Sequence, residues 1–305
     1  MSIVILGIFV ADTVYRADRL PRMGETLLGQ GFVLGPGGKG SNQAVAVARA
    51  GGQVQFLTRL GCDSFAAIAR DIWGRAGVQA VVRDDPDSYT GAAFIFLQEG
   101  TGANAIIVSP GAAGRISVQD IEAEAPRIAA ARLFMTQLEQ PVPPALRALQ
   151  IARAGGALTV LNPAPAAALP AGMIGLCDYI TPNESEAEAL TGIAVTGPDS
   201  AAAAADVLLA QGAGAVVVTL GAQGALYRDA TRRVHVPPVV AGPLVDTTGA
   251  GDAFSGGLAV ALAEGRPIEA ALRFATATAA LKVTRLGTAG AMPTRAEIDA
   301  LLAKG

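Results

Sequence analysis

Short apolar runs alternate along this chain with longer alanine-rich segments, and this alternation constrains the fold more than any other feature. The runs predicted as buried strands are 2–7, 53–60, 133–137, 157–161, 179–181 and 215–219. The segments predicted as helices are 41–50, which opens with the N-cap residue types Ser41 and Asn42, 64–76, 184–190 and 200–211. Strands that alternate with helices pair in parallel, and the helices cover both faces of the sheet. We therefore predict an α/β fold with a doubly wound, mostly parallel sheet.

Two further stretches, 25–34 and 92–108, contain strand-like residues but have no helix between their strand candidates. Glycine, proline and aspartate bound both of them. The residues leave open whether they form a small separate sheet or hairpins at the edge of the main sheet. A chain of 305 residues is long enough for one large domain, which we expect to span residues 1–305.

Charge and composition exclude several classes of function. The net charge of −3 and the pI of about 5.3 give no basic surface for nucleic acid. No apolar run reaches the ~18 residues of a membrane span. Because His235 is the only histidine, Ser-His-Asp and Cys-His catalysis would rest on one residue. Cys62 and Cys177 each stand alone in an apolar context, which predicts two buried thiols and a cytoplasmic protein.

The segment 246–257, DTTGAGDAFSGG, carries the most chemistry. A strand-like segment, 243–245, precedes it, and an apolar helical pattern follows over 253–263. The loop therefore becomes a helix N-terminus at Gly249, Ala250, Gly251 and Asp252. Unpaired backbone N–H groups and the helix dipole favour negative charge there. The pattern predicts an anion hole for charge that develops on a transferred phosphoryl group.

Asp252 has two interpretations. It lies in the first helical turn and could simply cap the helix. An N-cap, however, requires neither the two glycines of the GAGD segment nor a second acid at Asp246. A carboxylate beside an anion hole can accept the proton of an attacking hydroxyl, and general bases contribute ~10²–10⁴-fold to rate.

The segment 35–42, GPGGKGSN, contains the pattern GxGxxG. A dinucleotide fingerprint directly follows the first buried strand, but here that strand ends far upstream at Gly7. The segment is not a Walker A loop, because Gly40 rather than Ser or Thr follows Lys39. We expect Lys39 and Asn42 to approach a polyhydroxylated ligand. The alternative is a helix-entry loop with a solvated lysine.

Two other clusters are weaker signals. Asn183 and Glu186 are three residues apart at a predicted helix start, so both can face one site. Glu186 could hold a magnesium-bound water, or the pair could only cap the helix. The loop 219–224, TLGAQG, follows a buried strand, where α/β sheets bind ligands. It could contact a nucleotide or be an ordinary turn.

Together these segments resemble the ribokinase family of carbohydrate kinases, also called PfkB, over nearly the whole chain. The residues that carry the resemblance are GGKG at 37–40, Gln137–Glu139, Asn162–Pro165, TPNESEAE at 181–188, the loop at 219–224 and DTTGAGD at 246–252. The resemblance implies a ribokinase-like doubly wound sheet with a small β lid formed from about residues 13–36 and 90–109. It also implies that two lids pair in a homodimer.

The resemblance implies a role for each matching residue. It assigns Asp252 as the base, Gly249, Ala250 and Gly251 as the anion hole, and Asp12, Gly38, Lys39, Asn42 and Glu139 as sugar contacts. It assigns Asn183, Thr219, Gly221, Gly224 and Gly251 to the nucleotide, Glu186 to Mg²⁺ through water, and Asp246 and Thr248 to a monovalent cation. The implied cofactors are Mg²⁺ with ATP, and K⁺ as an activator.

Three residues depart from the family pattern. Val10 stands where asparagine usually contributes an amide to the sugar pocket, Ala291 where a serine often supports the cation loop, and Thr276 where histidine or asparagine often lies near adenine. The activity implied is ATP-dependent phosphorylation of the primary hydroxyl of ribose. Because of Val10, a deoxy sugar, fructose, a 2-keto-3-deoxy sugar acid or a nucleoside stays open as the substrate. A non-catalytic sugar-binding regulator is the alternative from another class.

Overall fold

A nine-stranded sheet forms the body of the protein, whose computed structural model describes residues 2–100 and 103–304. Its strand order is β13-β12-β11-β10-β9-β8-β1-β4-β5. Neighbours from β11 to β5 pair in parallel, and β12 and β13 are antiparallel. The strands are β1 (Ser2–Leu6), β4 (Gln53–Leu60), β5 (Gln79–Asp84), β8 (Leu133–Thr136), β9 (Leu158–Leu161), β10 (Tyr179–Ile180), β11 (Ala215–Thr219), β12 (Ala225–Asp229) and β13 (Arg233–Val236). The predicted mostly parallel sheet is confirmed.

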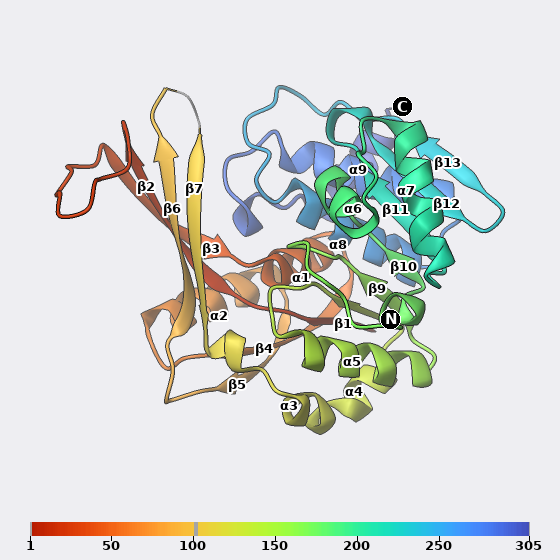
Figure 1. Cartoon of the computed structure of the whole chain (residues 1–305), viewed down its shortest axis with the longest axis horizontal. Helices are drawn as coiled ribbons and strands as arrows, with labels where there is room; N and C mark the ends of the chain where they lie inside the picture. Colours follow the sequence, from red (N-terminus) through yellow and green to blue (C-terminus); the bar gives the residue numbers. More distant parts are fainter. Residues whose placement is uncertain (1, 101–102, 305) are drawn as a thin grey trace.

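Helices cover both faces of this sheet because its buried strands are apolar on both sides (Figure 1). In β1, Ile3 and Ile5 join one core, while Val4 and Leu6 join the other. The first core is covered by α1 (Lys39–Arg49), α2 (Ser64–Ala76), α8 (Ala250–Ala263), α9 (Ile268–Lys282) and α10 (Arg295–Leu302). The second is covered by α3 (Val118–Ala123), α4 (Ala125–Ala129), α5 (Val142–Ala154), α6 (Glu184–Thr191) and α7 (Pro198–Ala210). The fold is thus doubly wound.

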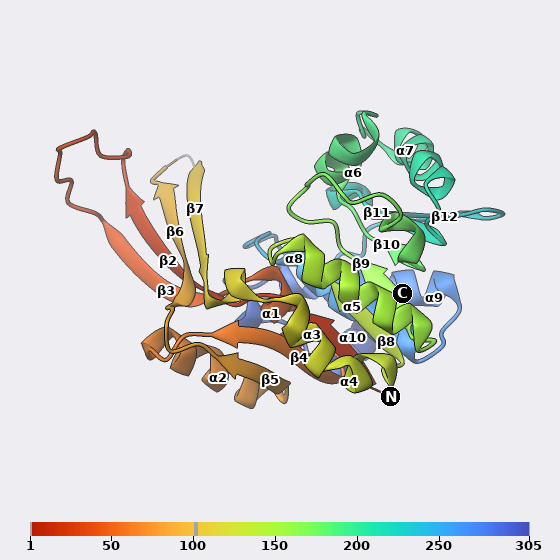
Figure 2. The ribbon, with the colours of Figure 1, turned by 60° about the horizontal axis from the view of Figure 1, so that its bottom comes forward.

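A second sheet of four strands projects from the body (Figure 2), and we call it the lid sheet. Its strands are β2 (Val10–Ala17), β3 (Gly31–Gly37), β6 (Thr90–Gln98) and β7 (Asn104–Gly111). The order is β3-β2-β6-β7, with β2 and β6 parallel and the outer pairs antiparallel. The two stretches left open by the sequence therefore form a separate sheet. Residues 25–30, however, lie outside any strand, and β2 lies outside the two strand-like stretches, in a segment that only the family resemblance assigns to the lid.

Three local predictions are wrong. Helix α1 begins at Lys39 after Gly38, so Ser41 and Asn42 are buried inside its first turn rather than capping it. Segment 243–245 is not a strand, because it runs along the end of α9, where Val245 N–H donates to the Val283 carbonyl. Cys62 is exposed, since it directly follows β4 in the loop before α2. No helix among the described residues is long and apolar enough to cross a membrane.

Candidate active site

Asp252 lies in the first turn of α8, facing the first turn of α1. Its carboxylate oxygens accept hydrogen bonds from Asn42 Nδ2 at 3.0 Å and from Gln43 Nε2 at 3.1 Å. The side chain is only 7% exposed. Burial raises the pKa of the Asp252 carboxyl, while the Lys39 charge and the two amide donors oppose the rise. The carboxylate is therefore held in one orientation by two neutral donors.

A chain of buried amides continues from Asp252 into the main sheet. Gln43 Nε2 also donates to Asn162 Oδ1 at 3.0 Å, and Gln43 Oε1 accepts from Gln137 Nε2. Asn162 Nδ2 in turn donates to the Thr181 carbonyl at 2.8 Å. These bonds tie α1 and α8 to the carboxyl ends of β8, β9 and β10. The network fixes the Asp252 carboxylate relative to the sheet.

The turn before α8 offers unpaired backbone donors. Ala250 N–H donates to the Thr247 carbonyl at 3.1 Å. In the part of the chain that the structure describes, the N–H groups of Gly249, Gly251 and Asp252 have no hydrogen-bond partner. A Cβ added at Gly251 would meet no atom within 4 Å, so this residue borders open space. The helix start thus presents the donors and the room that an anion needs.

Asp252 and this turn line a cavity of about 160 Å³. Its lining comprises Lys39, Asn162, Thr181, Asn183, Glu186, Thr219, Thr247, Gly249, Ala250, Gly251, Asp252 and Ser255. The Lys39 ammonium makes no hydrogen bond or ion pair to any described residue. A larger hollow of about 670 Å³ beside residues 166–172 contains no titratable side chain. The smaller cavity is therefore where the chemistry-bearing residues converge.

Residues assigned to a sugar gather next to this cavity. Lys39 N–H donates to Glu139 Oε2 at 2.7 Å, and the left-handed φ of 89° at Gly38 permits this approach. Burial raises the pKa of Asp12 to about 6 and that of Glu139 to about 7, and repulsion among these carboxylates and Asp252 adds to both shifts. Asn42 Oδ1 is buried without a partner. A ligand hydroxyl could donate to this oxygen.

Residues assigned to the nucleotide are only partly brought together. Asn183 and Glu186 form a capping box at the start of α6, with bonds of 2.9 and 2.8 Å, yet both also line the cavity. Thr219 lines it beside Asn183, to which it is joined by a β-bridge. Gly221 and Gly224 form the turn after β11 but are not among the lining residues.

Comparison with known proteins identifies the family. The family described as pfkB family carbohydrate kinase matches residues 1–295. The chain belongs to the PfkB family of carbohydrate kinases. As a PfkB carbohydrate kinase, it is an enzyme that phosphorylates a carbohydrate, and the family named from sequence motifs is confirmed.

Individual relatives cover nearly the full chain of this PfkB kinase. A ribokinase from Haemophilus influenzae is 38% identical over 298 residues, covering 97% of this chain and 96% of the relative. A deoxyribokinase from Salmonella typhi is 36% identical over 295 residues and covers 96% of each. The structure of Arabidopsis thaliana ribokinase complexed with ribose and ATP matches with a TM-score of 0.92 at 30% identity, covering 98% of both chains. The ribokinase-like fold is therefore confirmed.

A monovalent cation at Asp246 and Thr248 fits this PfkB kinase poorly. The Asp246 carboxylate accepts N–H groups from Thr248 and Gly287, each at 2.9 Å. These donors lower the pKa of the Asp246 carboxyl against the opposing effect of its partial burial, and Lys282 adds to the decrease. The Asp246 carbonyl accepts a bond from the Lys282 ammonium at 2.8 Å. A positive charge already lies where the implied cation would act.

Sequence reasoning missed Gln43 and Lys282. Gln43 is fully buried within the first turns of α1, where the surrounding segment is apolar. Because a buried amide needs partners, its position could have signalled a polar network. Lys282 is likewise a lone cation near the end of an apolar helix, and buried lysines are rare unless they are paired. The sequence does not indicate the partner of Gln43 or of Lys282, because the fold alone brings those partners close.

Proposed function

We propose that this carbohydrate kinase transfers the γ-phosphoryl group of ATP to the primary hydroxyl of ribose, with Asp252 as the general base. The observation that carries the proposal is the Asp252 carboxylate, fixed by Asn42 and Gln43 beside unpaired amides of the α8 N-terminus. Burial raises the pKa of the Asp252 carboxyl, which makes its carboxylate a stronger proton acceptor than an exposed one. The ribose and ATP complex of the Arabidopsis relative supports the choice of substrates.

In this mechanism the protein acts by positioning and by electrostatics. Asp252 accepts the proton as the sugar oxygen attacks the γ-phosphorus in line, and the bond from this phosphorus to the β–γ bridging oxygen breaks to release ADP. The amides of Gly249, Gly251 and Asp252 stabilise the negative charge on the transferred group. The unpaired Lys39 ammonium lines the same cavity, where it can bind phosphate oxygens or sugar hydroxyls.

Mg²⁺ is expected to arrive with ATP. Among the described residues, no group of three His, Cys, Asp or Glu side chains could hold a metal ion alone. Mg²⁺ does not need such a group, because it keeps several waters and binds mainly to substrate phosphates. Glu186, whose side chain lines the cavity, would meet it through water. When bound, Mg²⁺ neutralises charge on the phosphate oxygens. Activation by K⁺ stays a prediction, and the buried Lys282 argues against it.

A second candidate substrate is 2-deoxyribose, and Val10 is the observation that favours it. Val10 opens β2 and is only 4% exposed, so its branched side chain occupies space at the junction of body and lid sheet. A valine cannot donate to a sugar hydroxyl. The similarity to the Salmonella typhi deoxyribokinase supports this alternative. Fructose, 2-keto-3-deoxy sugar acids and nucleosides remain further candidates.

A substrate panel with an ADP-release assay tests the proposal. Ribose should give the highest kcat/KM among ribose, 2-deoxyribose, fructose, 2-keto-3-deoxygluconate and adenosine. The matched variant Val10→Asn should move the preference further toward ribose, because it restores the amide that the family resemblance assigns to the sugar pocket. A higher kcat/KM for any other compound would replace ribose as the substrate. Ligand-dependent stabilisation without ADP release from any of them would support a binding protein instead.

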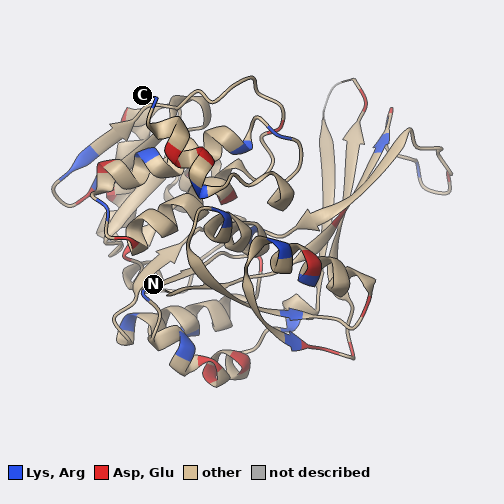
Figure 3. Ribbon diagram, turned by 180° about the vertical axis from the view of Figure 1, so that it is seen from behind, with Lys and Arg blue, Asp and Glu red and all other residues tan. Residues whose placement is uncertain are grey.

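We also infer that two copies pair through their lid sheets. Large apolar side chains are exposed on β3 and β7, namely Phe32, Val33, Leu34, Ile106, Ile107 and Val108. Figure 3 shows that the lid strands carry few charged residues compared with the helices of the body. Exposed apolar patches of this kind mark interaction surfaces. Pairing would remove this surface from water.

A further inference from the structure

Lys282 is a buried cation that the proposed mechanism does not use. It ends α9, and its side chain is 0% exposed. Its ammonium donates to the Asp246 carbonyl at 2.8 Å and lies 3.9 Å from Asp246 Oδ2. A buried ammonium is costly unless a negative group accompanies it. Asp246 supplies that partner from the loop that leads into α8.

The loop around Asp246 is closed by hydrogen bonds. The Asp246 carboxylate accepts two backbone N–H groups, and the Val283 carbonyl accepts the N–H groups of Val245 and Asp246 at 2.8 and 3.1 Å. A carbonyl oxygen has two lone pairs, so Val283 has none left for an added ion. Ala291, in the same region, has no side-chain oxygen to contribute. Of these three residues, only Asp246 has oxygens that could coordinate K⁺, and the Lys282 ammonium already contacts them.

The Lys282 charge also acts on the first turn of α8, where Asp252 lies. It lowers the pKa of the Asp252 carboxyl, so it acts on the base as well as on Asp246. Thr247, the residue after Asp246, accepts the Ala250 N–H at the start of α8. Lys282 thus contacts the first residue of the short loop that sets the position of the anion hole.

We propose that the Lys282 ammonium is a built-in cation of this loop, taking the place of an added monovalent ion, so that the kinase works without K⁺. Lys282 is a positioning residue, because it acts on the anion hole through Asp246. This inference rests on the proposed kinase function. It contradicts the activation by K⁺ that the family resemblance implies, because Lys282 already supplies a positive charge at Asp246.

The test compares wild type with Lys282→Met, which removes the charge and keeps most of the volume. The control is Lys304→Met, which removes the same charge from an exposed position beyond α10. ADP release is measured in KCl and in choline chloride at matched ionic strength. Wild type and Lys304→Met should differ less than about twofold between the salts. Lys282→Met should lose about tenfold in kcat in choline chloride and recover part of it in KCl.

Melting temperatures in the two salts give a readout that needs no activity. Only Lys282→Met should melt higher in KCl than in choline chloride, because removal of the ammonium leaves room for an ion that binds the native state. A wild type that KCl activates about tenfold or stabilises specifically would overturn the inference. So would a Lys282→Met variant that responds to K⁺ in neither readout. If that variant does not fold, the salt response of wild type alone decides. A wild type that releases no ADP defeats the kinase proposal and leaves the melting test valid.

Discussion

The buried carboxyl of Asp252 and the partly buried carboxyls of Asp12 and Glu139 share the candidate active site with the unpaired Lys39 ammonium. Asp252 contributes to the raised pKa of both Asp12 and Glu139, and Lys39 opposes the shift of Glu139. Without a sugar, these groups repel one another in a poorly solvated space. Sugar hydroxyls that donate to the carboxylates would relieve this repulsion. At the scale of single residues, the site therefore lowers the stability of the sugar-free protein in favour of sugar binding.

The pH dependence of stability tests this trade. Burial raises the pKa of Glu139 to about 7, above its ordinary value of 4.5. The folded state then binds the proton more tightly, so the contribution favours folding below the unfolded pKa and is lost as pH rises through about 7. Glu139→Gln should therefore raise the melting temperature over wild type at about pH 8, and this gain should shrink at about pH 5. It should also raise KM for the sugar.

The control for this prediction is Glu188→Gln, an exposed residue of α6. It should show no such pH-dependent gain in melting temperature. A Glu139→Gln variant that melts below wild type at alkaline pH would contradict the assigned electrostatic cost.

The room in front of the anion hole depends on the absence of a side chain at Gly251. Glycine within a helix costs roughly 0.5–1 kcal/mol relative to alanine. Gly251→Ala should therefore keep or raise the melting temperature, while kcat/KM for ATP falls about tenfold or more. Gly74→Ala in α2 is the matched control, because a Cβ there also meets no atom within 4 Å. It should gain stability and keep activity. If Gly251→Ala kept full activity, the proposal that phosphate binds at this turn would be refuted.

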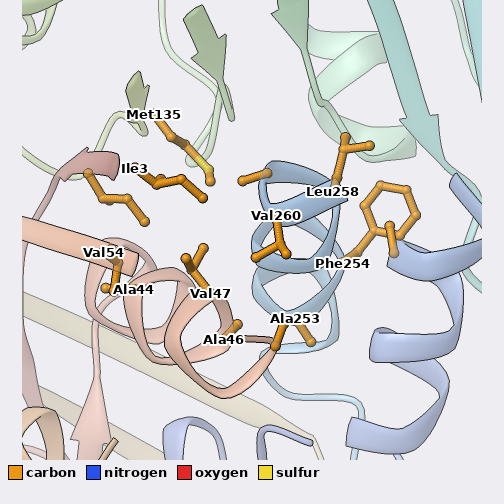
Figure 4. Close-up of a cluster of buried hydrophobic side chains, with 14 of the residues drawn as sticks. Ile3, Ala44, Ala46, Val47, Val54, Met135, Ala253, Phe254, Leu258 and Val260 are labelled. Atoms are coloured by element: carbon orange, nitrogen blue, oxygen red, sulfur yellow. The ribbon is translucent and has the colours of Figure 1, made fainter. Parts of the chain in front are cut away.

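At the scale of elements, the site depends on the close packing of α1 against α8. A Cβ added at Gly256 would lie 2.5 Å from the Cβ of Ala46, so the two helices approach closely at this point. Figure 4 shows Val47 and Ala46 of α1 facing Val260 and Ala253 of α8. This contact brings the amides of α1 within hydrogen-bond distance of Asp252.

Gln43 is the polar link between these two helices. Gln43→Met should destabilise the protein by about 1–3 kcal/mol, because it leaves buried partners unpaired. It should also lower kcat, since Asp252 loses one of the two donors that orient it. Denaturant unfolding and ADP release measure the two effects. Gln55→Met, which removes an exposed amide pair with Gln79, should change neither. If Gln43→Met kept wild-type kcat, the orienting role would be refuted.

Elements with a clear local pattern could be predicted from the sequence, but their contacts could not. The start of α8 is such a case, since GAGD combines glycines with an acid at the beginning of an apolar helix. The lid sheet is a partial case, because its β2 and β6 pair in parallel across a long sequence separation that no local pattern encodes. Asp252 lies 209 residues from its partner Gln43, and Asp246 lies 36 residues from its partner Lys282, so both pairs became visible only in the fold.

At the scale of the whole molecule, the exposed apolar side chains of the lid sheet predict a homodimer. Ile107 is 67% exposed on β7. Ile107→Glu should convert a dimer into a monomer in analytical ultracentrifugation, because charge would be buried against apolar surface. Val240→Glu, at a position 83% exposed outside the lid sheet, should remain dimeric. A wild type that sediments as a monomer at all concentrations would contradict the pairing.

The central claim is that the Asp252 carboxylate accepts the proton of the attacking hydroxyl. Asp252→Asn keeps the shape of the side chain but cannot act as this base. In an ADP-release assay with saturating ribose and ATP, we expect a loss in kcat of about 10²-fold or more, with the sugar KM and the melting temperature little changed. A kcat within a few-fold of wild type in a folded Asp252→Asn protein would contradict the account.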